Sequence, residues 1–152
     1  MINALVFDFD GVILDTETPD YQTWQEVFQS KGVVLELSVW TQHIGGRAGR
    51  FDWHQHLEDL AGISIDRESL YLERRQRYLE IIRDNPVLPG ILDYIQDARQ
   101  LGMSLGVASS SSREWVEGHL SRLGILNLFD SIKGSDDVVQ VKPDPELYLA
   151  SV

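Results

Sequence analysis

The most informative segment of this 152-residue chain is VFDFDGVILDTE, at positions 6–17. An apolar run ends there in two aspartates one residue apart, Asp8 and Asp10, and a glycine follows at once. Side chains of a strand alternate in direction, so both aspartates can share one side while the phenylalanines between them point into a core. Two carboxylates beside an apolar core are costly unless a cation or hydrogen bonds compensate them. The segment predicts either a strand end capped by aspartates or a reactive site, and Asp15, which closes the short apolar loop, favours the site.

Two further features suit the binding of an anion. Gly11 allows a sharp turn, and its N–H can approach an anion without a side chain in the way. The run MSLGVASSSS, at 103–112, reads as an apolar strand that ends in hydroxyls just before a helix. Ser109 is placed at the strand end beside a helix N-terminus, where free N–H groups attract phosphate. Ser110 is a second candidate phosphate ligand, although the serines from 110 to 112 also fit as loop and cap residues, with a predicted capping box of the form S-x-x-E at 111–114.

A third motif, KPDPE, occupies positions 142–146. Asp144 is predicted to cap a helix and Pro145 to be its first residue. Lys142 then lies in the loop just ahead of that helix. A lysine in such a place is usually a solvated surface residue, and the alternative is a cation that faces the two aspartates.

These three motifs resemble those of the haloacid dehalogenase superfamily, in particular the branch that contains β-phosphoglucomutase and phosphoglycolate phosphatase. The resemblance runs from residue 3 to the end of the chain. It implies that Asp8 is a nucleophile, that Asp10 is a general acid and base, and that Ser109 holds phosphate. It also implies that Lys142 bridges the nucleophile and the phosphoryl oxygens, and that the Asp8 side chain and the Asp10 carbonyl bind Mg²⁺.

The function implied is a Mg²⁺-dependent phosphatase that acts on a small phosphorylated metabolite through an aspartyl-phosphate intermediate. One alternative is a phosphosugar mutase. The sugar mutases of the family carry a catalytic histidine five residues after the position of Asp15, and this chain has Asp20 there. That difference favours simple hydrolysis. A second alternative is an inactive phosphate-binding or interaction module.

The family's fourth motif, an acidic pair that supplies metal ligands, has no counterpart in the sequence. The chain ends at Val152, in a run that reads like an interrupted helix, so we expect a C-terminally truncated core without its last strands and with weak or no activity. Without a neighbour, the strand predicted at 4–7 would expose unpaired backbone groups, and self-association through that edge is expected.

The predicted fold is α/β, with a doubly wound, Rossmann-like parallel sheet and an inserted helical cap. Residues 1–16 and 87–152 form the core, and residues 17–86 form the cap. Apolar residues recur every three to four positions within the insertion, as in packed helices. One such stripe is formed by Leu72, Leu79 and Ile82, with Asp66 as the predicted cap of that helix.

Substrate choice in this family belongs to the cap. The candidates in this sequence are Glu17, His43, Arg47 and Arg50, the two arginines lying in a glycine-rich loop where they can bind a second anionic group. The tryptophans at 24, 40, 53 and 115 are interpreted as core residues rather than as substrate platforms.

The composition excludes several classes of partner. The formal charge of −11 disfavours binding to nucleic acid or to anionic membranes, which depend on basic patches. No apolar run approaches the ~20 residues of a membrane span. The chain contains no cysteine, which fits a reducing compartment, and we expect it to be cytoplasmic.

Overall fold

The computed structural model describes residues 2–44 and 51–151, and the chain divides into two compact units. One unit combines residues 1–15 with residues 86–152, and the other is residues 16–85. The boundaries expected from the sequence lie one residue later at both crossings. Within the described residues, no helix is long and apolar enough to cross a membrane.

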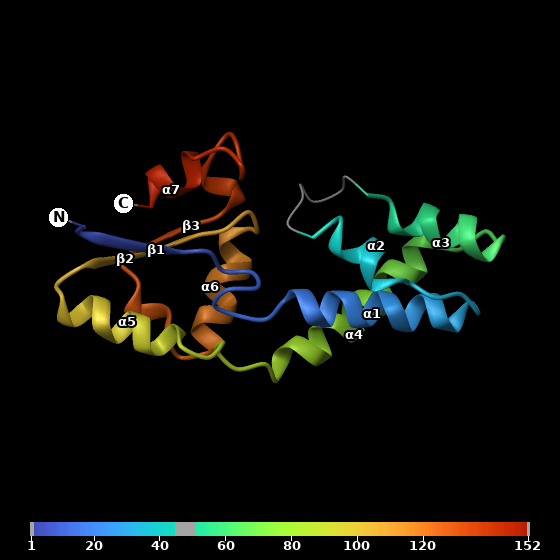
Figure 1. The fold of residues 1–152 in the computed structure, drawn as a ribbon, viewed down its shortest axis with the longest axis horizontal. Helices are drawn as coiled ribbons and strands as arrows, with labels where there is room; N and C mark the ends of the chain where they lie inside the picture. The colour runs from blue at the N-terminus through green and yellow to red at the C-terminus, as the bar shows by residue number, and fades with distance from the viewer. Residues whose placement is uncertain (1, 45–50, 152) are drawn as a thin grey trace. The chain divides into compact units, whose positions relative to one another are not determined.

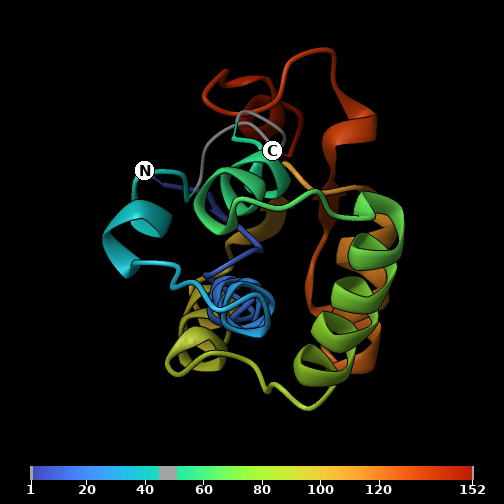
Figure 2. The same ribbon diagram turned by 90° about the vertical axis from the view of Figure 1, so that its right-hand side faces the viewer.

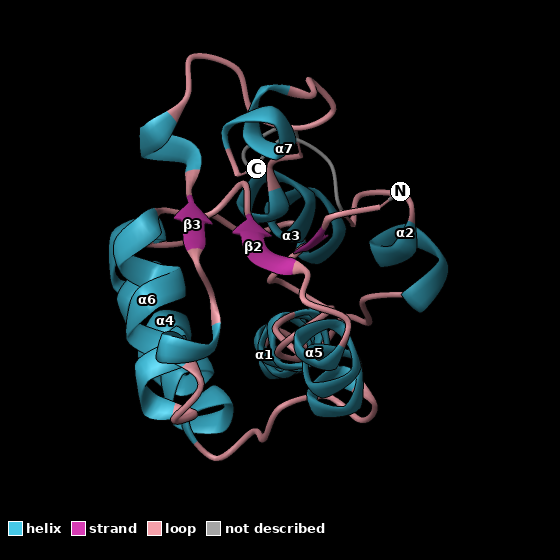
Figure 3. Cartoon of the chain, turned by 90° about the vertical axis from the view of Figure 1, so that its left-hand side faces the viewer, coloured by secondary structure: helices cyan, strands magenta, loops and turns pink. Residues whose placement is uncertain are grey.

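The first unit is built around a three-stranded parallel sheet (Figure 1 and Figure 3). Leu5 is in register with Leu105 between the first two strands, and Val107 is in register with Ile132 between the second and the third. Because the strands are parallel, their carboxyl ends meet at one edge of the sheet. In sheet order, the strands are β1 (Ala4–Phe7), β2 (Ser104–Ala108) and β3 (Ser131–Lys133).

Helices cover both faces of this sheet. Helix α5 packs against β2 and α6 packs against β3, while α7 lies on the opposite face (Figure 1 and Figure 3). The predicted α/β class, with a parallel sheet between helical layers, is confirmed. The helices are α5 (Ile91–Gln100), α6 (Arg113–Arg122) and α7 (Glu146–Ala150), and short 3₁₀ turns occur at Leu126–Leu128 and Ser135–Asp137.

Two helices of this unit begin one residue later than predicted. The N-cap of α6 is Ser112 rather than Ser111, and its hydroxyl accepts the backbone N–H of Trp115 at 3.3 Å. Helix α7 begins at Glu146 rather than at Pro145, although the Asp144 carboxylate still accepts the N–H of Glu146 at 3.0 Å. The serine run offers several equivalent caps, so the sequence did not define which hydroxyl would be used.

The alternation predicted after β1 is present. Phe7 and Phe9 are buried, whereas Asp8 and Asp10 are only partly covered. The loop that follows returns to the core through two fully buried apolar side chains. The largest side chains buried completely in this unit are Phe9, Ile13, Leu14, Leu105, Val107, Val116, Leu120 and Leu147.

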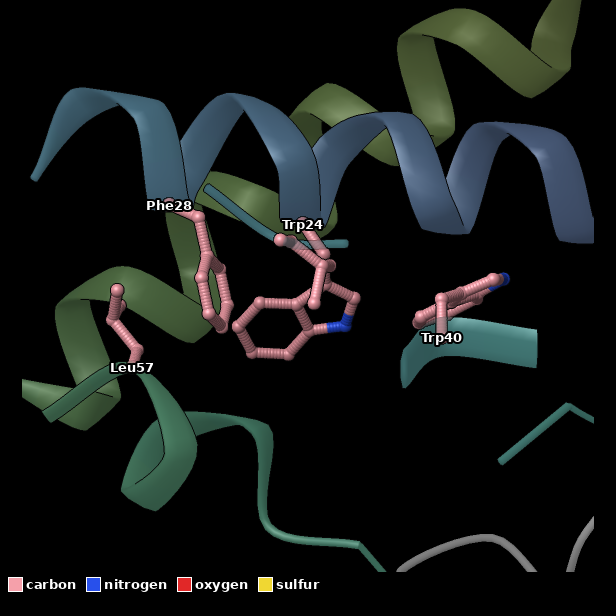
Figure 4. Close-up of a cluster of buried hydrophobic side chains, with 5 residues drawn as sticks. Trp24, Phe28, Trp40 and Leu57 are labelled. Atoms are coloured by element: carbon pink, nitrogen blue, oxygen red, sulfur yellow. The ribbon is translucent and has the colours of Figure 1, made fainter. Parts of the chain in front are cut away.

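The second unit consists of helices around its own aromatic core, and Figure 2 shows the first of these helices end-on. The core residues, drawn in Figure 4, come from three of its helices and one connecting loop. They are Trp24, Phe28, Leu35, Trp40 and Leu57. The helices are α1 (Glu17–Ser30), α2 (Leu37–Thr41), α3 (Trp53–Ala61) and α4 (Arg67–Arg83).

Helix α4 faces the rest of this unit differently from the prediction. Asp66 caps it as expected, accepting the N–H of Ser69 at 3.2 Å. Of the predicted apolar stripe, however, only Ile82 is buried, while Leu72 and Leu79 are exposed. The face turned toward α1 carries arginine instead, and Arg74 pairs with Asp20 at 2.6 Å. The side of α4 that faces α1 is therefore partly polar, and its buried residues are Tyr78 and Ile82.

We predict that Gly106→Ala destabilises the first unit by about 1–3 kcal/mol. A Cβ at Gly106 would lie 2.8 Å from the carbonyl oxygen of Ser151, so α7 and β2 would have to separate. The matched control is Gly118→Ala in α6, where no described atom lies within 4 Å of the added Cβ. That control should raise stability by roughly 1 kcal/mol through helix propensity. Urea unfolding of the three proteins would measure both changes, and equal stabilities would contradict the close contact.

We also predict that stability falls as the pH drops below neutrality because of His54. Burial lowers its pKa, against the smaller opposing effect of Asp52, and no described group bonds to its Nε2. Since the unfolded chain then binds the proton more readily, stability is lost as the pH falls through the unfolded value of about 6.5. The loss levels off below the folded pKa. Thermal unfolding between pH 7.5 and 5 should be less pH-dependent in His54→Phe, and an unchanged slope would exclude His54 as the cause.

Candidate active site

Asp8 is held by a cation that comes from the far end of the sequence. It follows β1 directly, and its Oδ1 lies 2.7 Å from Nζ of Lys142. The same oxygen accepts the backbone N–H of Phe9 at 2.7 Å. The lysine contact is not directed along a hydrogen bond, so it is an electrostatic pair rather than a bond with fixed geometry. Neither contact uses Oδ2 of Asp8, which leaves that oxygen for chemistry.

The loop that carries Lys142 is closed by a carboxylate. Glu146, the first residue of α7, accepts the N–H of Val139 at 3.1 Å and that of Gln140 at 2.8 Å. Nζ of Lys142 also lies 5.1 Å from the ring centre of Tyr148, within the range of a cation–π contact. The Lys142–Pro143 peptide is cis. The lysine is therefore positioned by its own loop and by the helix that follows.

Asp10 accepts three hydrogen bonds from uncharged donors. The hydroxyls of Ser109 and Ser111 donate to its Oδ2 at 3.0 and 2.7 Å. The indole N–H of Trp115 donates to its Oδ1 at 3.3 Å. Both carboxylate oxygens are thus engaged by residues from the end of β2 and the first turn of α6. This fixes the orientation of Asp10 beside Asp8.

Ser109 is fully buried where β2 ends. Its backbone N–H donates to the carbonyl of Lys133 at 3.0 Å, which ties it to β3. Its hydroxyl oxygen accepts the N–H of Ser111 at 2.9 Å while the hydroxyl proton goes to Asp10. Ser110 is exposed and makes none of these contacts. Ser111, interpreted from the sequence as a cap residue, occupies the site instead.

Gly11 supplies the turn that was predicted, but its N–H is occupied. Its φ of 71° lies in the left-handed region that glycine adopts readily. The N–H donates to the carbonyl of Leu14 at 2.8 Å, and the carbonyl of Phe9 accepts the N–H of Ile13 at 2.9 Å. The expectation that Gly11 offers a free N–H to phosphate is therefore wrong for this structure, because the loop closes on itself.

The candidate substrate contacts belong to the second unit, and the first unit contains none of them. Glu17 is the first residue of α1 in the helical unit, and His43 stacks on Phe51 there with ring centres 3.9 Å apart. Arg47 and Arg50 lie outside the described residues.

Trp115 was missed as a site residue by the sequence analysis. It is half-buried, with its ring 4.2 Å from that of His119, rather than part of the apolar core. The sequence offered one signal for this role of Trp115. The residue lies three positions after the N-cap of α6, so its side chain belongs to the first helical turn, close to the end of β2. Trp24 and Trp40 are buried in the core of the helical unit, as predicted.

The donor set around Asp8 suits a hard cation in part. The Asp8 carboxylate and the Asp10 carbonyl are oxygen ligands of the type that Mg²⁺ prefers. Both side-chain oxygens of Asp10 are engaged by Ser109, Ser111 and Trp115, so this side chain does not join them. Among the described residues, no group of three or more metal-binding side chains converges. Mg²⁺ commonly retains several water ligands, so two protein oxygens are compatible with it.

Comparisons with known proteins agree with this geometry. The chain is 46% identical over 149 residues to YhcW of Bacillus subtilis, a protein whose name gives a provisional phosphatase assignment. This alignment covers 98% of the chain and 67% of YhcW. It is 30% identical to validoxylamine A 7'-phosphate phosphatase of Streptomyces hygroscopicus subsp. limoneus, with 97% and 68% covered. The chain thus spans about two thirds of the length of these relatives.

The fold is also shared with solved structures. The crystal structure of β-phosphoglucomutase from Clostridium difficile aligns with a TM-score of 0.68 and 26% identity, covering 99% of this chain and 70% of that one. The family model of haloacid dehalogenase-like hydrolases matches residues 2–152. With its aspartate pair, buried serine and lysine gathered at one sheet edge, this chain belongs to the haloacid dehalogenase-like hydrolase family.

Proposed function

We propose that this protein hydrolyses a phosphate monoester of a small metabolite by transferring the phosphoryl group to Asp8. The observation that supports this most directly is the pairing of Asp8 with Lys142 at 2.7 Å, beside an Asp10 held by three donors. A carboxylate is a weak nucleophile, so it needs a cation that stabilises the phosphoryl oxygens and an acid that protonates the leaving group. Lys142 and Asp10 meet these two needs.

In the first step, an oxygen of Asp8 attacks phosphorus and the bond from phosphorus to the ester oxygen breaks. That ester oxygen takes the proton of the Asp10 carboxylic acid and leaves as an alcohol. Lys142 stabilises the negative charge on the phosphoryl oxygens, and the buried hydroxyl of Ser109 donates to one of them. Ser110, which is exposed, stays a candidate phosphate ligand only if the loop rearranges around a ligand.

In the second step, the Asp10 carboxylate takes a proton from a water molecule whose oxygen attacks phosphorus. The bond from phosphorus to Asp8 breaks and inorganic phosphate leaves. Asp10 is then protonated again, so the net reaction consumes one water for each ester. The same side chain therefore serves as the general acid in the first step and as the general base in the second.

The Asp8 side chain and the Asp10 carbonyl are the proposed ligands of Mg²⁺. When bound, this ion would supply positive charge that offsets the charge of the phosphoryl oxygens. The need for it follows from the composition of the site, since two aspartates face a single lysine and the whole chain carries a formal charge of −11. An anionic ester requires a locally positive site.

The helical unit is proposed to act as a cap that selects the substrate, with Glu17, Arg47 and Arg50 as its candidate contacts. The substrate class is a small phosphorylated metabolite, in line with the phosphate ester named for the relative from Streptomyces hygroscopicus subsp. limoneus. We propose that it acts in the cytoplasm. Self-association through the edge of β1 is part of the same proposal, because β1 pairs only with β2 among the described strands.

We expect Mg²⁺-dependent hydrolysis of para-nitrophenyl phosphate that is weak in the 152-residue chain and that Asp8→Asn lowers to the background rate, since removal of a nucleophile abolishes the covalent route. Removal of the metal by EDTA should give a comparable loss that Mg²⁺ restores. The control is Asp93→Asn, an exposed carboxylate of α5 that should leave the rate unchanged. Full activity in Asp8→Asn would refute the mechanism, and phosphate binding without any hydrolysis would favour the inactive module.

Hydrolysis and mutase activity give different products from the same ester. We expect that a hexose 1-phosphate incubated with the protein and Mg²⁺ releases inorganic phosphate, which ³¹P NMR would detect. The physical reason is that Asp20, at the position of the catalytic histidine of the sugar mutases, is engaged by Arg74 at 2.6 Å. Accumulation of the hexose 6-phosphate would instead identify the protein as a mutase. Mutase activity is the one named for the structural relative from Clostridium difficile.

A further inference from the structure

We propose that Trp115 is a positioning residue that holds the carboxyl group of Asp10 in a fixed orientation through its indole N–H, which donates to Oδ1 at 3.3 Å. The claim rests on the proposed function, because it concerns the acid of that reaction. The Trp115 proposal extends the proposed function, because it gives a role to an aromatic side chain outside the three sequence motifs of the site.

Trp115 is fixed from two directions. Its backbone N–H is capped by the Ser112 hydroxyl at 3.3 Å, which sets the first turn of α6. Its ring meets that of His119 edge to face, with centres 4.2 Å apart, and His119 in turn lies 6.1 Å from the ring of Phe9. Phe9 is the fully buried residue between the two aspartates. The indole is thus tied to the same segment that carries Asp10.

The indole differs chemically from the two hydroxyls on Asp10. A serine hydroxyl can donate or accept, so it can bond to either the charged or the neutral carboxyl group. An indole N–H can only donate. The indole therefore supplies a donor of fixed direction to Oδ1 of Asp10, whereas the two hydroxyl groups on Oδ2 can reverse their direction.

The indole contact is also independent of the phosphate. Ser109 has a single hydroxyl proton, and this proton leaves Asp10 when the hydroxyl turns to a phosphoryl oxygen. Ser111 and Trp115 then remain as the donors on Asp10. Of these two, only the rigid indole is held by ring packing as well as by the helix cap. Trp115 therefore keeps the carboxyl group oriented during the step in which Ser109 serves the substrate.

A spectroscopic test reads this contact without any activity. The chain contains four tryptophans, so a ¹⁵N-indole spectrum has four side-chain N–H signals, and Trp115→Phe identifies the one of interest. In Asp10→Ala, the Trp115 signal should shift and its proton should exchange faster with water, because the acceptor is gone. The signals of Trp24 and Trp40, in the helical unit, should not move. A Trp115 signal that stays in place in Asp10→Ala would overturn the proposal.

A kinetic test separates positioning from packing. Trp115→Phe keeps an aromatic ring but removes the N–H, and we expect kcat to fall about ten-fold with KM changed less than two-fold, the typical effect of losing one hydrogen bond to a charged group. Trp115→His, which retains a ring N–H, should recover part of the loss. The control is Glu114→Gln, an exposed neighbour on the same helix.

The two tests keep the proposals apart. If hydrolysis depends on Asp8 but kcat is unchanged in Trp115→Phe, the positioning role is wrong and the proposed function stands. If the wild-type protein does not hydrolyse phosphate esters, the proposed function and the positioning role of Trp115 in that reaction both fail. The indole signal would still report whether Trp115 holds Asp10.

Discussion

The pairing of Lys142 with Asp8 is the interaction on which the site depends. An aspartate at the end of β1 is costly unless a cation lies close to it, because the neighbouring Phe7 and Phe9 are buried in the apolar core. That cation comes from a loop 134 positions later in the chain, and the loop is held by the two N–H groups that bond to Glu146. The carboxylate is therefore stabilised only when β1, β2 and the start of α7 are all in place.

The hydrogen bonds of Ser109 show how the site is prepared before substrate arrives. Its hydroxyl group donates one hydrogen bond to Asp10 and accepts one from the N–H of Ser111. The buried hydroxyl therefore has a partner both as donor and as acceptor. A phosphoryl oxygen that binds there must compete with Asp10 for the same proton. Binding of the phosphoryl group would therefore remove the hydrogen bond from Ser109 to Oδ2 of Asp10. This would happen in the step in which Asp10 transfers a proton. The proposed ligand and the proposed acid are coupled through one hydroxyl.

The sequence predicted the parts of this arrangement that depend on local chemistry. Asp8 and Lys142 could be foreseen as charged residues at a strand end and before a helix, and the parallel sheet then brought them together. Trp115 could not, because an aromatic residue on an amphipathic helix indicates burial and says nothing about an N–H partner across the fold. Leu72 was misplaced for a related reason, since periodicity does not reveal that Arg74 pairs with Asp20 across the helices.

The chain divides into two compact units, and the proposed chemistry uses side chains of only one of them. Every contact of the proposed reaction is made within residues 1–15 and 86–152. The helical unit has its own aromatic core and its own ion pairs, including the one that engages Asp20. The position that carries the histidine of the sugar mutases is Asp20 in this chain, and its carboxylate is engaged by Arg74 of the neighbouring helix. In the proposed reaction Asp10 acts first as the acid and then as the base, and a water molecule accepts the phosphoryl group.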